Sequence, residues 1–164
     1  QKAAREFAKG EFDKELALEL DRKHEFPRKI WQKAAELGFI GVHYPEQYSG
    51  QNLGCLENIL IAEEFCARDS GIGSAIVLAS FASECVLRFG SDELKQRFLP
   101  QVAEGKMLSG GSFTEPGHGS DITSLDTTAV RHGAEWVING TKTFITHGGL
   151  AGLYCCSNHT GTPA

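Results

Sequence analysis

The stretch Gly110–Asp121, "GGSFTEPGHGSD", decides how the second half of this chain is interpreted, because it separates an expected strand beginning at Met107 from another in "DTTAV". Its four glycines and two carboxylates surround Pro116, with His118 among them. Glycine lets the backbone approach a ligand closely, and successive N–H groups in such turns can bind an anion such as a pyrophosphate. The alternative is a long turn without a ligand, and the loop taken alone favours that alternative.

Before this loop, up to about Lys106, the apolar residues recur at helical spacing. We expect a broken helix over 3–25, a second helix after Pro27 that stops at Gly38, and a third from Leu56 to Arg68. The apolar side of the third helix is predicted to hold Ile59, Leu60, Ala62, Glu63 and Cys66.

The stretch "AIVLASFASECVLRFG", residues 75–90, is apolar on nearly all sides. A helix of that kind is usually buried at the centre of a bundle. Ser91 is placed to cap the following helix, Pro100 is expected to interrupt it, and Gly105 to end the helical half.

From Met107 the period changes to two, which is typical of strands. "TTAVRH" and "EWVI" are followed by Asn139-Gly140 and "TKTFIT", and Asn-Gly predicts a type I′ hairpin turn. In such a strand Phe144 and Thr146 would share one face, about 7 Å apart. An aromatic plane beside a hydroxyl suits a flat ring that carries heteroatoms. The alternative is a packing residue beside an ordinary strand threonine.

A further strand is expected at "LYCCS", residues 153–157, and it leaves a sheet edge open. A helical half followed by a few strands predicts an α+β fold. We expect the remainder of a longer protein to cover the open edge.

Composition narrows the classes of function. The chain has 164 residues and a formal charge of -5, with a pI near 5.7 and no basic patch, so we expect no nucleic-acid partner. No run is judged to approach the roughly 20 apolar residues of a membrane span. The five cysteines form no C-x-x-C pair and the six histidines show no ligand spacing, so we expect reduced thiols and no metal.

Three segments together resemble the acyl-CoA dehydrogenase family. "FTEPGHGSD" is similar to the family's first signature, and "INGTKTFITHGG" is similar to its following hairpin. "YPEQYSGQNLG" fits as well, so the likeness runs from about Phe7 to Tyr154. The resemblance implies an N-terminal all-α helical bundle domain over 1–106, then part of a β-barrel-like middle domain over 107–164. It also implies that the family's C-terminal four-helix domain is absent from this chain.

The resemblance further implies an FAD flavoprotein that oxidises an acyl-CoA thioester to the 2,3-enoyl-CoA. A proton leaves the α-carbon and a hydride passes to flavin N5. The base is a glutamate of the C-terminal domain, so no catalytic residue is expected in this chain, and the fragment alone is expected to bind flavin weakly and to be inactive. An electron-transfer flavoprotein is the implied acceptor, and the full-length protein is implied to be a homotetramer.

Residue roles follow from the same resemblance. The residues implied to bind the cofactor are Gly111, Phe113, Thr114, Gly119, Ser120, Phe144, Ile145 and Thr146. Ser120 is also implied to meet the thioester. Ser74 and Val77, with Gly73 and Phe81, are implied to wall the acyl tail, and plain core packing is the alternative. Members acting on glutaryl-CoA carry an arginine near Gly73, so its absence favours an uncharged acyl group.

Three positions depart from the family pattern. Gly111 replaces a frequent aromatic residue and is expected to leave space beside the flavin. Phe144 stands where tryptophan is common, and it keeps an aromatic contact with less area. His147 stands where asparagine is frequent.

Other functions stay open at this point. An acyl-CoA oxidase or a related flavoprotein of the same fold is one alternative, and a catalytically inactive binding module is another. A serine hydrolase is disfavoured because "GGSFT" has Thr114 where the G-x-S-x-G pattern needs glycine. The expected location is the cytoplasm of a bacterium or the mitochondrial matrix of a eukaryote.

Overall fold

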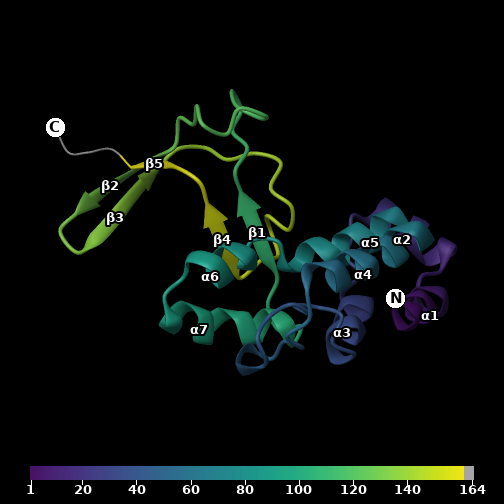
Figure 1. Cartoon of the computed structure of the whole chain (residues 1–164). Coiled ribbons are helices and arrows are strands. Elements are labelled where there is room, and N and C mark those ends of the chain that lie inside the picture. The colour runs from purple at the N-terminus through teal and green to yellow at the C-terminus, as the bar shows by residue number, and fades with distance from the viewer. Residues whose placement is uncertain (161–164) are drawn as a thin grey trace.

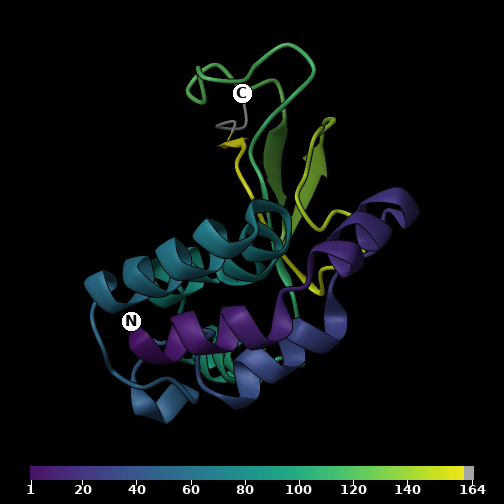
Figure 2. The same ribbon diagram turned by 90° about the vertical axis from the view of Figure 1, so that its right-hand side faces the viewer.

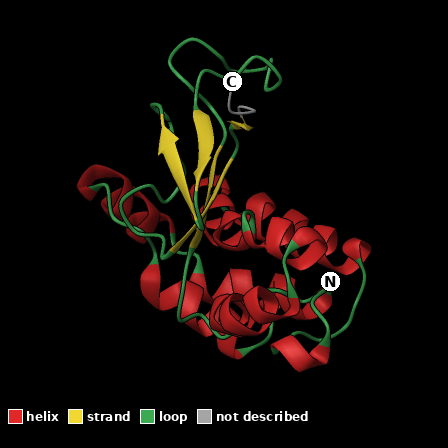
Figure 3. Cartoon of the chain, turned by 90° about the vertical axis from the view of Figure 1, so that its left-hand side faces the viewer, coloured by secondary structure: helices red, strands yellow, loops and turns green. Residues whose placement is uncertain are grey.

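The computed structural model describes residues 1–160 and consists of a helical part followed by strands (Figure 1). The helical segments are α1 (Lys2–Glu11), α2 (Lys14–Lys23), α3 (Arg28–Glu36), η1 (Glu46–Tyr48), α4 (Cys55–Arg68), α5 (Ser70–Val77), η2 (Leu78–Ser80), α6 (Ser83–Phe89) and α7 (Asp92–Ala103). The strands are β1 (Ser109–Ser112), β2 (Thr128–His132), β3 (Glu135–Asn139), β4 (Leu153–Cys156) and β5 (His159–Thr160). Figure 3 shows the strands gathered on one side of the helices. The fold is α+β, with its helical part first.

Local signals fix several helix ends. Asp69 accepts a hydrogen bond from the N–H of Ile72 at 2.8 Å, and Ser91 accepts one from the N–H of Leu94 at 3.3 Å. Each cap satisfies an N–H group that the helix leaves free, which is worth about 1 kcal/mol. Gly38 follows α3 with a φ of +74°, as expected for the residue that stops a helix.

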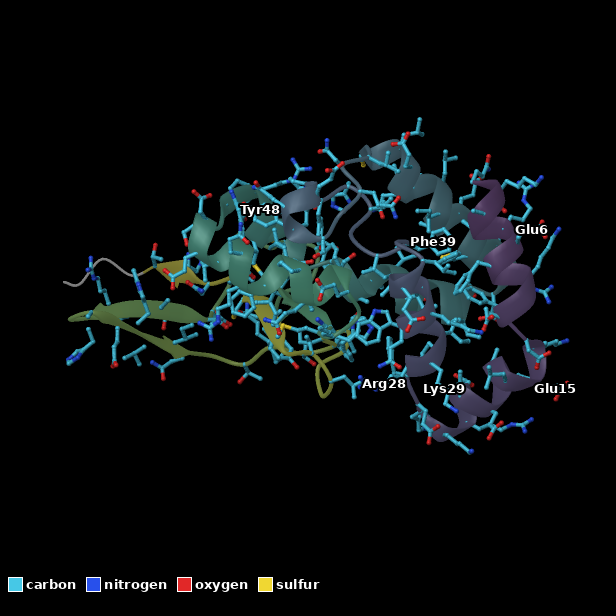
Figure 4. The ribbon with its side chains drawn as sticks, turned by 90° about the horizontal axis from the view of Figure 1, so that it is seen from below. Glu6, Glu15, Arg28, Lys29, Phe39 and Tyr48 are labelled. Atoms are coloured by element: carbon cyan, nitrogen blue, oxygen red, sulfur yellow. The ribbon has the colours of Figure 1, made fainter. Side chains whose placement is uncertain are left out.

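Aromatic rings form the centre of the helical part. They belong to Phe7, Phe12, Phe39 and Phe65, whose contacting ring centroids lie between 5.3 and 6.1 Å apart. Trp31 is also buried, with 1% of its surface exposed. The charged side chains Glu6 of α1, Glu15 of α2 and Lys29 of α3, labelled in Figure 4, are exposed. The first part of the chain therefore has its own hydrophobic core.

The buried side of α4 differs from the predicted one. Ile61, Glu64 and Phe65 face the core, whereas Ile59 is 56% exposed. Because α4 packs on both α1 and α5, those neighbours determine which residues are covered. Glu64 tolerates burial because Arg5 of α1 donates hydrogen bonds of 2.8 and 2.6 Å to its two carboxylate oxygens.

The prediction of one buried helix over 75–90 is wrong. The stretch breaks into α5, η2 and α6, and Phe81 and Phe89 are 53% and 85% exposed. By length and composition alone, Ser70–Phe89 is long and apolar enough to cross a membrane, so the prediction that no run approaches a membrane span is wrong. One such stretch is weak evidence of a span, because the core helix of a soluble protein has the same composition.

Pro100 does not interrupt its helix, contrary to the prediction, since α7 continues to Ala103. Proline inside a helix costs about 3 kcal/mol. Leu99 and Val102 on either side are fully buried, and burying side chains of this kind recovers about 1.5 to 3 kcal/mol each. Packing of the last turn therefore outweighs the local penalty.

The predicted hairpin around Asn139-Gly140 is wrong, and a different hairpin forms one strand earlier. β2 and β3 pair antiparallel, with His132 opposite Glu135, so Gly133 and Ala134 form the turn. Gly133 has a φ of +65°, which glycine adopts without strain. After Asn139 the segment 141–147 forms no strand with β3. Figures 1 and 2 show the β2–β3 hairpin standing away from the helices.

Two parallel pairings complete the sheets. β1 pairs with β4, as the expected strand at 153–157 allows, and β2 pairs with β5. β1 begins six residues after α7 ends, so the change from helix to strand occurs between Ala103 and Ser109.

Candidate functional site

A buried carboxylate anchors the glycine-rich loop. Glu115 is 3% exposed and accepts hydrogen bonds from the backbone N–H of Asp126 at 2.5 Å and of Thr127 at 3.0 Å. The ammonium of Lys142 donates a third at 2.7 Å. Burial by itself raises the pKa of Glu115, but these donors outweigh it and lower the pKa to about 2. The carboxylate is therefore ionised at neutral pH and closes the base of the loop.

The same lysine ties the loop to the segment after β3. Lys142 Nζ donates to the carbonyl of Phe113 at 3.1 Å as well as to Glu115. The next residue, Thr143, donates its N–H to the carbonyl of Thr114 at 3.0 Å. The two segments that resemble the family's signatures thus lie against each other, although 29 positions separate Phe113 from Lys142.

The tip of the loop is exposed. Pro116 and Gly117 form a tight turn, and Asp121 accepts hydrogen bonds from Thr123 and Ser124 that lower the pKa of its carboxyl to about 2. Gly119 and Ser120 are both exposed, and a Cβ built on Gly119 would meet no atom within 4 Å. These two predicted binding residues therefore border open space.

Phe144 and Thr146 do not share a strand face, so the geometric argument from strand spacing is wrong. Phe144 has a φ of 55° and is 91% exposed, and Thr146 begins a turn that runs to Leu150. The N–H of Gly148 bonds to the carbonyl of Ile145 at 2.9 Å, which curls the chain away from β3. The backbone N–H of Thr143 and the side chain of Lys142 bond to the glycine-rich loop, and neither residue continues a ladder with β3.

A cavity of about 490 Å³ lies between α2, α5 and the turn after Ile145. It brings together Thr146, Ser74 and His147, and Thr114 is not among its lining residues. The hydroxyl of Ser74 donates to the carbonyl of Ser70 in its own helix at 2.6 Å. The hydroxyl of Ser74 is therefore engaged within α5.

Val77 lines a different cavity, of about 310 Å³, together with Phe81 and Glu84. The two predicted acyl-wall residues, Ser74 and Val77, thus border separate hollows. Both hollows touch Leu78, which is 37% exposed.

Gly111 does not leave free space, contrary to the expectation. A Cβ at this position would lie 2.6 Å from the ring of Phe113 and 2.9 Å from the ring of Phe81. Those two rings meet edge to face with centroids 5.9 Å apart. Aromatic side chains from β1's end and from the segment after η2 fill the volume that an aromatic residue at position 111 would take.

Gly73 cannot wall an acyl chain. It is buried, and a Cβ there would lie 2.7 Å from backbone atoms of Phe65 and Cys66 in α4. The residue is glycine because the two helices approach closely, so the lack of an arginine at this position carries no information on the acyl group.

His147 lies partly inside the protein. Its ring meets Phe26 edge to face at 5.2 Å, and its Nδ1 is 3.4 Å from the carbonyl of Ser109. Nε2 is buried without a hydrogen-bond partner among residues 1–160. Burial lowers the pKa of this imidazole.

Glu115, His118 and Asp126 bring one possible metal-binding atom each within 4.8 Å of one another. Both oxygens of Glu115 already accept hydrogen bonds, and Lys142 adds a positive charge beside them. This cluster therefore closes the loop, and we assign it no metal.

Sequence reasoning missed the pairing of Glu115 with Lys142. Glu115 lies in one signature-like segment and Lys142 in the other. Their presence in these segments was the only feature of the sequence that could have indicated the pair. A buried charged pair leaves no periodic pattern, because each residue alone has the composition of an exposed loop.

The chain is a helical part followed by strands, and its two signature-like segments are in contact. The family model described as "Acyl-CoA dehydrogenase, N-terminal domain" matches residues 1–106, and "Acyl-CoA dehydrogenase, middle domain" matches residues 111–163. The chain belongs to the acyl-CoA dehydrogenase family. The C-terminal domain of the family lies outside this sequence.

Several known proteins are similar. Acyl-CoA dehydrogenase FadE12 of Mycobacterium tuberculosis is 38% identical over 80% of this chain and 34% of its own length. Acryloyl-CoA reductase (NADH) of Anaerotignum propionicum is 36% identical over 93% of this chain and 39% of its own length. The chain thus spans well under half the length of these relatives.

Solved structures of acyl-CoA dehydrogenases have a similar fold. A probable acyl-CoA dehydrogenase from Mycobacterium abscessus has a TM-score of 0.89 at 35% identity, covering 99% of this chain and 43% of that one. A glutaryl-CoA dehydrogenase from Mycobacterium smegmatis in complex with FADH2 has a TM-score of 0.87 at 28% identity, covering 96% of this chain and 40% of that one.

Proposed function

We propose that this chain is the N-terminal and middle-domain portion of an FAD-dependent acyl-CoA dehydrogenase. The observation that carries the proposal is the contact between the two signature-like segments, through Lys142 to Phe113 and through Thr143 to Thr114. It brings the loop and the segment with Phe144 to one place. A relative in complex with FADH2 and one complexed with FAD support the proposal that the protein binds a flavin.

The residues present fit a planar cofactor in two respects. Phe144 exposes 91% of its surface, and covering an aromatic side chain of this size returns about 1.5 to 3 kcal/mol. Gly119 and Ser120 border open space, so a pyrophosphate could approach their backbone N–H groups. Gly111 contributes through the aromatic pair of Phe81 and Phe113 that its lack of a side chain permits.

The residues proposed to hold FAD are Gly111, Phe113, Thr114, Gly119, Ser120, Phe144, Ile145 and Thr146. When bound, FAD supplies the oxidant, which takes a hydride from the β-carbon of the acyl group. The residues of this chain would hold and orient it: Phe144 would lie against the ring, and the hydroxyl of Thr146 would donate a hydrogen bond to it. Donors fixed in advance stabilise negative charge that develops on a ring during reduction.

The proposed substrate is an acyl-CoA thioester, because relatives named for acyl-CoA, acryloyl-CoA and (2S)-methylsuccinyl-CoA are 36% to 40% identical to this chain. Ser120 is proposed to meet the thioester, with Ser74 and Val77 near the acyl tail. The base that removes the α-proton is proposed to be a glutamate of the C-terminal domain. The fragment by itself is therefore proposed to be inactive.

The wider setting is also a proposal. An electron-transfer flavoprotein is the proposed electron acceptor, a homotetramer the proposed assembly, and the cytoplasm or a mitochondrial matrix the proposed location. We place the domain boundary at 106/107, between the end of α7 and the start of β1.

The test uses the full-length protein that carries this sequence. It should purify with bound FAD, and adding acyl-CoA thioesters of increasing chain length without oxygen should bleach the flavin absorbance band. The chain length with the largest bleaching identifies the substrate. A full-length protein that contains FAD but shows no bleaching with any acyl-CoA would contradict the proposed reaction.

A further inference from the structure

We propose that Glu115 and Lys142 are positioning residues that hold the two walls of the flavin site in register. This inference rests on the proposed function, because the walls are those assigned to the flavin above. Neither residue is assigned a contact with the cofactor or the substrate. Their role is to fix the backbone that carries Phe113 and Thr114 relative to the backbone that carries Phe144 and Thr146.

Lys142 lies where three separate segments meet. Its ammonium has three hydrogens, and it lies 2.7 Å from Glu115 Oε1, 3.1 Å from the Phe113 carbonyl and 3.5 Å from Ser157 Oγ. Ser157 directly follows β4, which pairs with β1. One side chain thus joins the glycine-rich loop, the segment after β3 and the end of β4.

Successive bonds set the register between the two walls. The side chain of Lys142 binds the carbonyl of Phe113, and the N–H of Thr143 binds the carbonyl of Thr114. Two neighbouring carbonyls are therefore held by two neighbouring residues. The chain then needs one further step to reach Phe144, so a shift of these contacts would move the exposed ring directly.

Glu115 closes the loop from the other side. Its two oxygens accept the N–H groups of Asp126 and Thr127, at the point where the loop returns toward β2. The residues between, including Gly119 and Ser120, form a compact loop with both ends tied to one carboxylate. The same carboxylate binds Lys142, so both walls depend on this one ion pair.

Stability alone does not account for a charged pair at this position. The side chains of Glu115 and Lys142 are 2% and 11% exposed. A buried ion pair is often no more stabilising than apolar residues of the same volume, because taking two charges out of water is costly. What the pair offers beyond an apolar contact is direction. Glu115 accepts hydrogen bonds from two specific backbone N–H groups, and Lys142 donates one to a specific backbone carbonyl.

The experiment compares Glu115→Gln, Lys142→Met and Lys142→Arg in the full-length protein. Glu64→Gln is the matched control, because Glu64 is also a buried carboxylate held by a cationic side chain, Arg5, but lies in the helical core. Three readouts are needed: thermal stability, hydrogen exchange of the Thr143 amide, and the dissociation constant of FAD. The exchange measurement is made on flavin-free protein, so it does not depend on the cofactor.

Lys142→Met and Glu115→Gln should each speed exchange of the Thr143 amide by about tenfold or more, the scale of one lost charge-assisted hydrogen bond. They should weaken FAD binding by a similar factor. Lys142→Arg keeps the charge and the hydrogen-bond donors, so it should retain most of the protection of the Thr143 amide and most of the FAD affinity. Glu64→Gln should lower stability and leave the Thr143 amide and FAD binding unchanged.

The proposal is overturned if Glu115→Gln and Lys142→Met lose stability as Glu64→Gln does, while Thr143 exchange and FAD affinity stay at wild-type values. Should Lys142→Met fail to fold, Glu115→Gln, which keeps the side-chain volume, gives the same comparison. A wild-type protein that never binds FAD contradicts the proposed function separately, and the exchange data then still decide whether the ion pair holds the two segments together.

Discussion

The rings of two phenylalanines occupy the space in which a side chain at Gly111 would lie. The rings of Phe81 and Phe113 lie 2.9 and 2.6 Å from where a Cβ would be. Gly111→Ala should therefore lower the free energy of unfolding by about 1 kcal/mol, the low end of the cost of overpacking, because the two rings can partly turn aside. Gly119→Ala is the control, since its Cβ would meet no atom within 4 Å. Chemical denaturation of both variants checks this, and equal losses would contradict the packing account.

His147 makes stability depend on pH. Its pKa is lowered in the folded protein because burial disfavours the charged ring. The unfolded chain therefore binds a proton at higher pH than the folded chain, and the free energy of unfolding should fall as pH drops below about 6.5. His147→Asn should remove this part of the pH dependence. Denaturation curves between pH 8 and pH 5, on the order of half a unit apart, compare the two proteins; parallel profiles would contradict the assignment.

Among elements, the α4–α5 contact is the one most sensitive to a single methyl group. A Cβ at Gly73 would lie 2.7 Å from backbone atoms of α4, which cannot turn aside as a side chain can. Gly73→Ala should destabilise the protein by about 2 kcal/mol or more, beyond the gain of up to 1 kcal/mol from better helix propensity.

Gly71→Ala in the same helix is the matched control, because its nearest contact would be 3.4 Å from a side-chain oxygen of Asp69. That variant should be neutral or slightly more stable. Thermal melting of both proteins gives the comparison. If Gly73→Ala melts at the wild-type temperature, the close approach of the two helices is wrong.

At the level of elements the sequence predicted what local chemistry determines. The cap at Ser91, the stop at Gly38 and the strand at 153–157 each depend on a few neighbouring residues, and all three are present. The turn of the hairpin was misplaced because Asn139-Gly140 is a strong local signal. The N–H of Thr143 nonetheless binds the carbonyl of Thr114, a contact distant in sequence that no local rule contains.

The candidate site was predicted in part. The segments around Thr114 and Phe144 were expected to converge, and the bonds from Lys142 and Thr143 bring them together. The means of convergence was not predicted, since it depends on a buried Glu115–Lys142 pair rather than on strand spacing. The roles of the eight proposed flavin residues stay predictions.

In the described part of the whole molecule, several large apolar side chains of the β part are uncovered. Trp136, Ile138 and Phe144 in the β part are 54%, 53% and 91% exposed. The chain spans 34% to 43% of the relatives compared, and the C-terminal domain of the family lies outside it. Of these residues, Phe144 is the one proposed to contact the flavin. Its effect on FAD affinity therefore distinguishes a flavin contact from coverage by other parts of the protein.

The most direct test is the dissociation constant of FAD in the full-length protein with Phe144→Ala, compared with Phe89→Ala. Both residues are highly exposed phenylalanines, at 91% and 85%, but Phe89 lies at the end of α6 and has no proposed contact with the flavin. Phe144→Ala should weaken FAD binding by about tenfold or more, since an aromatic side chain returns about 1.5 to 3 kcal/mol when it is covered. Phe89→Ala should leave the constant unchanged. Equal FAD affinity in both variants and in the wild-type protein would contradict the claim that this segment forms a wall of the flavin site.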